Sequence, residues 1–165
     1  MLLLNSLTSA IQNTRSVDTK LRFFVIAPLK MVPFGPTDTT GRDSLGNPTA
    51  LDIMAEPDNA EDIYMIAVTA YEEPLNADDT ALTAVMKNLV SDTTMVHIAN
   101  HGKQDGQPAV WATLNRTHKD GSIDLIDCVV TSKGNHLFLL QWRSLDGPFS
   151  HDKARRTFFD SFKML

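Results

Sequence analysis

The chain is poor in cysteine: its 165 residues include one, Cys128. A single cysteine cannot form a disulfide within the chain, so a disulfide framework is excluded and the redox compartment stays open. Cys128 lies in the middle of an expected strand, where a free cysteine usually serves as a small buried apolar residue. A domain of this length can bury enough surface to fold without a disulfide or a metal.

Long apolar runs and excess basic charge are also lacking. No stretch approaches the roughly 20 apolar residues that a membrane-spanning helix requires, although peripheral membrane contact stays open. The formal net charge at pH 7 is −5, with 15 Lys and Arg against 20 Asp and Glu. Nucleic-acid-binding proteins normally present a basic face, so this balance argues against a nucleic-acid partner.

Motifs for catalysis, nucleotide binding and metal binding are missing as well. The patterns G-x-S-x-G, G-x-G-x-x-G and the P-loop do not occur. The five histidines lack the spacing of a zinc site, and no cysteine pair supports one. The acidic pairs Glu72-Glu73 and Asp78-Asp79 stand at the ends of expected elements, where we expect solvated turn residues and helix-dipole partners. The sequence therefore predicts a protein that is not an enzyme and has no cofactor.

The last third of the chain carries the clearest fold signal. Asp120-Gly121 and Gly134-Asn135 favour tight hairpins because these residues tolerate positive φ, so three strands of a meander are expected. The third strand covers His136 to Arg143. Its apolar side chains alternate between two faces, with Leu137 and Leu139 on one and Phe138, Leu140 and Trp142 on the other. A strand that is apolar on both faces is typically central in its sheet, with a packed layer on each side.

Two amphipathic helices are expected. The first covers Asn76 to Val90, with Asn76 as its N-cap; its apolar positions are Leu82, Val85, Met86 and Leu89. The second follows Ser150 as N-cap and has Asp152 in its first turn, where the helix dipole favours an anion. Its apolar stripe consists of Ala154, Phe158, Phe159 and Phe162.

The rest of the chain reads as strands and loops. Strands are expected over Lys20–Ala27, Thr49–Ala55, Ile63–Tyr71 and Thr93–Ala99, with a Pro- and Gly-rich loop over 29–48. Strands in series with two separated helices indicate an α+β fold, a mainly antiparallel sheet flanked by helices. We expect a single domain over residues 20–165. Residues 1–15 are either a short helix that docks on a partner or the remainder of a longer signal sequence.

Several apolar residues lie where a partner could contact them. Leu3, Leu4 and Leu7 share one face of the N-terminal segment, and Met31, Val32 and Phe34 are carried in the long loop. Trp142 stands near a strand end. These seven residues are the candidate partner-binding set. For the loop residues and Trp142 the default interpretation is packing on the core, and partner binding is the alternative.

Three stretches read together are distinctive. They are the opening strand with its proline (Phe23, Phe24, Ile26, Pro28), the strand–turn–strand around Gly134 (Val129, Val130, Leu137, Leu139), and the closing run Ala154-Arg155-Arg156 with Phe158-Phe159-Asp160-Ser161-Phe162. This arrangement resembles the PsbP-like domains, a superfamily with a compact α/β/α sandwich. Its members include extrinsic photosystem proteins, a nuclear-import factor that binds a small GTPase, bacterial lipoproteins and chaperones for secreted effectors. Their shared theme is binding to other proteins without catalysis.

These expectations combine into one functional hypothesis. The chain is expected to be a non-enzymatic accessory or scaffold protein whose partners are other protein subunits of a larger assembly. The alternative is a small-ligand-binding module with a cavity between the sheet and its helices. The compartment is left open, because no clear signal peptide is present.

Overall fold

The computed structural model describes residues 13–36, 39–43, 46–56, 62–88, 94–144 and 152–165, with the backbone alone for 94–98. Most of the expected N-terminal segment, including Leu3, Leu4 and Leu7, lies outside the described residues. From Thr14 onward the chain is strand β1 (Thr14–Asp18), so the expected helix does not extend to residue 15.

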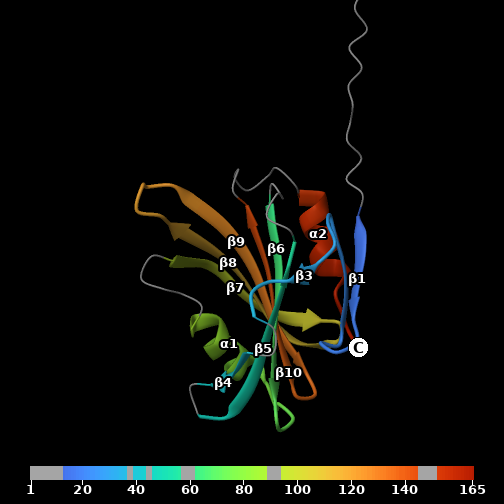
Figure 1. Ribbon diagram of the computed structural model, residues 1–165. Coiled ribbons are helices and arrows are strands. Elements are labelled where there is room, and N and C mark those ends of the chain that lie inside the picture. The colour runs from blue at the N-terminus through green and yellow to red at the C-terminus, as the bar shows by residue number, and fades with distance from the viewer. Residues whose placement is uncertain (1–12, 37–38, 44–45, 57–61, 89–93, 145–151) are drawn as a thin grey trace, which may run out of the picture.

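A large antiparallel sheet forms the body of the molecule (Figure 1). Its strand order is β3-β5-β6-β10-β9-β8-β7, with β4 also paired to β5. The bounds are β3 Val32–Pro33, β4 Thr39–Arg42, β5 Pro48–Ala55, β6 Asp62–Tyr71, β7 Thr94–Gln104, β8 Gln107–Thr117, β9 Ile123–Lys133 and β10 His136–Ser144. Strand β10 lies in the middle, between β6 and β9, which confirms the prediction from its two apolar faces.

Tight turns join the strands of the meander at the predicted places. Gly121 and Gly134 both have positive φ, 85° and 59°, in the turns that follow β8 and β9. A third hairpin turn has Asp105 and Gly106 at φ 48° and 80°, the left-handed region that two-residue hairpin loops require. Because this turn is so short, β7 continues to Gln104 instead of ending near Ala99.

Helix α2 (Asp152–Ser161) and a three-stranded sheet cover one face of the large sheet. The small sheet has the order β1-β2-β11, with β2 Phe23–Ala27 and β11 Lys163–Met164. The ring of Phe158 meets Tyr64 at a centroid distance of 5.1 Å, and Phe162 lies between Phe23 and Phe138 at 6.2 and 5.5 Å. The predicted aromatic stripe of α2 therefore lies in the main hydrophobic core.

Helix α1 (Asp79–Asn88) covers part of the opposite face, over β8 and β9. Leu82 and Met86 are buried there against a set of strand residues, Val110, Ala112, Leu114, Ile126, Cys128 and Val130. The helix begins later than expected: Asp78, not Asn76, is the N-cap, because its Oδ1 accepts the backbone N–H of Ala81 at 2.9 Å. With layers on both faces of an antiparallel sheet, the chain has the α+β architecture that its sequence predicts.

The tract over 29–48 is more regular than a loop. Val32 and Pro33 pair with Ala55 and Met54, and β4 pairs with β5 from Thr39–Leu51 to Arg42–Pro48. These short strands satisfy the backbone groups along the outer edge of β5, which would otherwise be open to pairing with another chain. The pairing partner, and not local propensity, decides their structure.

Candidate functional site

A groove of about 760 Å³ opens between α1 and the end of the large sheet where β5 begins. Its wall on one side is the α1 face that carries Ala81, Ala84 and Val85, and its floor includes Leu75 and Leu137. The turn before β5 and the chain that leaves β6 form the remaining sides. The volume is in the range of ligand pockets, and the position matches the cavity that the alternative functional hypothesis expects.

Backbone hydrogen bonds hold the wall of the groove in place. The N–H of Tyr71 donates to the carbonyl of Asn135 at 2.9 Å, and the Asn135 side-chain amide donates back to the Tyr71 carbonyl at 2.6 Å. Four residues later, the N–H of Leu75 donates to the carbonyl of Gly134 at 2.8 Å. The β9–β10 turn therefore anchors the segment 71–75, which gives the groove a built shape.

The groove is acidic. Among its lining residues are the carboxylates Asp43, Glu72 and Glu73, and none of the described lining residues is Lys, Arg or His. The side chain of Tyr71 lies beside Asp43: burial and this neighbouring charge raise the pKa of the phenol. The sequence predicted solvated turn residues at Glu72-Glu73, and both are exposed.

The second feature is the segment from Leu29 to Phe34, here called the 29–34 segment. Leu29, Val32 and Phe34 are 37%, 38% and 55% exposed, whereas Met31 is buried in the main core. Met31 is thus a core residue, which corrects its assignment to a partner-binding surface. Val32 and Phe34, by contrast, have side chains that are accessible to a partner.

Hydrogen bonds at several points hold the backbone of the 29–34 segment. The N–H of Phe34 donates to the Ile53 carbonyl at 2.8 Å, and the N–H of Met31 donates to Ser16 Oγ at 3.0 Å. At its start, the N–H of Leu29 donates to Glu56 Oε1 at 2.5 Å. The exposed apolar side chains therefore project from a fixed support.

Glu56 was not singled out from the sequence, yet its pKa is the most strongly raised among the described carboxyl groups. The residue is 6% exposed, and Oε2 makes no hydrogen bond within the described part of the chain. Burial raises its pKa from 4.5 to about 7; the Leu29 hydrogen bond opposes the shift, and Asp62 adds to it. The carboxyl therefore changes its charge near neutral pH.

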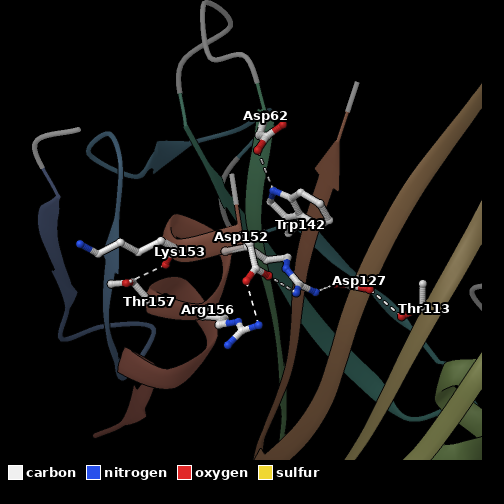
Figure 2. A network of polar contacts seen from close by, with 9 residues as sticks. Asp62, Thr113, Asp127, Trp142, Asp152, Lys153, Arg156 and Thr157 are labelled. Carbon is white, nitrogen blue, oxygen red and sulfur yellow. Dashed lines mark hydrogen bonds and ion pairs between the residues drawn. The ribbon is translucent and has the colours of Figure 1, made fainter. Parts of the chain in front are cut away.

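Trp142 is fully buried, which corrects its assignment as a partly exposed anchor. Its Nε1 donates to Asp62 Oδ2 at 3.0 Å, as Figure 2 shows. The guanidinium of Arg155 lies 5.3 Å from the centre of its ring, a cation–π arrangement. No local pattern predicts the Trp142–Asp62 hydrogen bond, because Asp62 is 80 residues away along the chain.

Arg155 on α2 pairs with one carboxylate of the large sheet and with one of its own helix. It contacts Asp127 on β9 and donates to Asp152 Oδ1 at 2.5 Å, while Thr113 Oγ1 donates to the other oxygen of Asp127 at 2.6 Å (Figure 2). Arg156 forms a further ion pair with Asp152 at 2.8 Å. This network joins elements that are already in contact, so we interpret it as structural.

The described residues offer little to a nucleophilic or metal mechanism. Cys128 is buried, and this burial raises the pKa of its thiol to about 12, far from that of a reactive thiolate. In the described ranges, no three His, Cys, Asp or Glu side chains gather as a metal ion would require. Over the same ranges, no helix is long and apolar enough to cross a membrane.

A scan against protein-family models finds no match, and a search of curated proteins finds none either. Among solved structures, cyanobacterial PsbP (CyanoP) from Synechocystis sp. PCC 6803 superposes with a TM-score of 0.62 at 14% identity. The match covers 96% of this chain and 95% of that one. This chain has the PsbP-like fold.

The PsbP-like fold confirms the resemblance and the fold class that the sequence indicated. A structure from Bacteroides thetaiotaomicron VPI-5482 also matches, with a TM-score of 0.48 and 14% identity. That match covers 87% of this chain and 45% of the other, so this chain spans less than half of that protein's length.

Proposed function

We propose that this chain is a non-enzymatic accessory protein that binds a larger protein assembly through its 29–34 segment. The observation that carries the proposal is the exposure of Leu29, Val32 and Phe34 on a backbone that hydrogen bonds hold fixed. Aromatic and apolar side chains provide most of the binding energy at protein interfaces. A support that is already ordered reduces the entropy lost on binding.

The fold supports the same proposal. The PsbP-like domains that the sequence resembles share binding to other proteins as their theme, and the Synechocystis structure carries the name PsbP. A shared fold alone supports a function only by analogy, so the assignment of a docking function rests on the exposed side chains.

Affinity purification from the native host tests this function. The tagged chain is compared with the double variant Val32→Ser, Phe34→Ser and with Ile123→Ser, a control that removes another exposed apolar side chain, 61% exposed at the start of β9. We expect a partner set near equal stoichiometry with the parent chain and the control, and its loss with the double variant. Equal recovery with all three proteins would exclude the 29–34 segment as the docking surface.

The N-terminal leucines are a second docking element in this proposal. Deletion of residues 1–12 leaves β1, which begins at Thr14, intact. We expect the deletion to weaken association with the assembly and to leave the unfolding midpoint unchanged. A large fall in that midpoint would instead assign Leu3, Leu4 and Leu7 to the core of the domain.

A further inference from the structure

The charge of Glu72 and Glu73, in the groove beside α1, is not neutralised within the described part of the chain. Glu72 and Glu73 are exposed and form no ion pair or hydrogen bond within the described part of the chain. Elsewhere on the molecule, several carboxylates have cationic partners: Asp124 pairs with Arg143, Asp152 with Arg155 and Arg156, and Asp105 with Lys163. Glu72 and Glu73 thus present negative charge without the compensation found at those sites.

Beside these carboxylates is a surface that suits apolar side chains. Leu75, Val85 and Leu137 are partly buried groove residues, and the ring of Tyr71 adjoins them. Carboxylates next to an aromatic ring are a favourable environment for a Lys or Arg side chain, because the ring face also attracts cations. The groove can therefore contact apolar side chains of a ligand and bind a neighbouring cation at the same time.

The shape of the groove favours a polypeptide over a small molecule. Ala81, Ala84 and Asn88 on its α1 wall are exposed, as are Glu72, Glu73 and Pro74 on the other side. Small-molecule sites usually enclose about 70–90% of their ligand, which this open wall does not allow. The small side chains of Ala81 and Ala84 leave room for a backbone to approach α1 closely.

We propose that this groove binds a protein segment in which apolar side chains are flanked by Lys or Arg. The site is separate from the 29–34 segment: Val32 pairs with Ala55 at the end of β5, whereas the groove lies at Pro48, where β5 begins. These ends are seven residues apart, about 23 Å at the usual rise of a strand. The proposal therefore does not depend on the one above.

Selection of a displayed library of random twelve-residue peptides on the full chain tests the site. We expect the selected peptides to be enriched in Lys or Arg next to Leu, Ile, Val or Phe. Their binding should weaken as salt rises, because exposed charges are screened. Amide chemical shifts should change at Tyr71, Leu75, Val85 and Leu137 when a selected peptide is added.

Two variants and one control decide the assignment. Replacing Glu72 and Glu73 together by Gln should weaken the selected peptide's binding about three- to tenfold, in line with the loss of two exposed ion pairs. Ala84→Lys, which places a cation on the groove wall without disfavouring the helix, should weaken it at least as much. Asp160→Lys changes the net charge by the same two units at an exposed site on α2 and should leave the affinity unchanged.

Four results would overturn the proposal. Selected peptides without cationic enrichment, or an equal loss of affinity in Asp160→Lys, would show that the groove carboxylates do not recognise the ligand. Shift changes confined to the 29–34 segment would assign the peptides to another surface. If octylamine binds the groove as tightly as the selected peptides, the ligand of the groove is a small amphipathic cation and not a protein segment.

Discussion

Glu56 makes the stability of this protein depend on pH in a predictable direction. In an unfolded chain its pKa is 4.5, and in the folded protein burial raises the pKa to about 7. Between these values the folded state keeps a proton that the unfolded chain has released, so the free energy of unfolding falls as pH rises. One pKa unit corresponds to about 1.4 kcal/mol, so the full contribution is about 3 kcal/mol, complete above pH 7.

The variant Glu56→Gln removes this dependence. An amide keeps an acceptor oxygen for the Leu29 N–H and carries no charge to desolvate. Urea unfolding of the parent chain, Glu56→Gln and the control Asp160→Asn is measured at pH 5, 6, 7 and 8. We expect the stability of Glu56→Gln relative to the parent chain to grow by about 2–3 kcal/mol between pH 5 and 8.

The control separates this effect from the general loss of a negative charge. Asp160 is exposed, so Asp160→Asn should follow the parent chain at every pH. If the difference between Glu56→Gln and the parent chain stays constant from pH 5 to 8, Glu56 titrates alike in the folded and unfolded states, and its burial does not make stability depend on pH.

Four further substitutions test the packing, the helix cap and an ion pair by the free energy of urea unfolding. Phe158→Ala should cost about 3–5 kcal/mol, since the side chain is fully buried against Tyr64; a cost below about 1 kcal/mol would contradict the core assignment. Asp78→Ala should cost about 1 kcal/mol as the loss of a helix cap, whereas Asn76→Ala should cost nothing measurable. Arg155→Met should cost about 2–3 kcal/mol, less than a fully buried pair because the guanidinium is partly exposed; a neutral result would show that Asp127 finds other compensation.

The features that the sequence predicted well are local and periodic. Strand β10 is apolar on both faces, and α2 repeats its aromatic residues at helical spacing, so each pattern is complete within about ten residues. The turns at Gly121 and Gly134 depend on the φ preferences of a few residues. Hence the centre of the sheet and the helix on each of its two faces could be predicted.

The features that were missed depend on residues far apart in the chain. Strands β3 and β4 are short, and they exist because β5 offers them backbone partners. Trp142 near a strand end looked accessible, but Asp62 and Arg155 enclose it. The acidic groove combines the turn before β5, the segment after β6 and one face of α1, and no local pattern predicts that these three meet.

Cross-linking at position 34 in the native host shows directly whether the 29–34 segment docks on a partner protein. A photoreactive benzophenone side chain replaces Phe34 in one protein and Ile123 in a control, both of which are exposed apolar positions. After illumination, we expect a discrete cross-linked product at position 34, with a partner protein identified by mass spectrometry, and none at position 123. The same products at both positions, or no product at position 34, would contradict a docking role for the 29–34 segment.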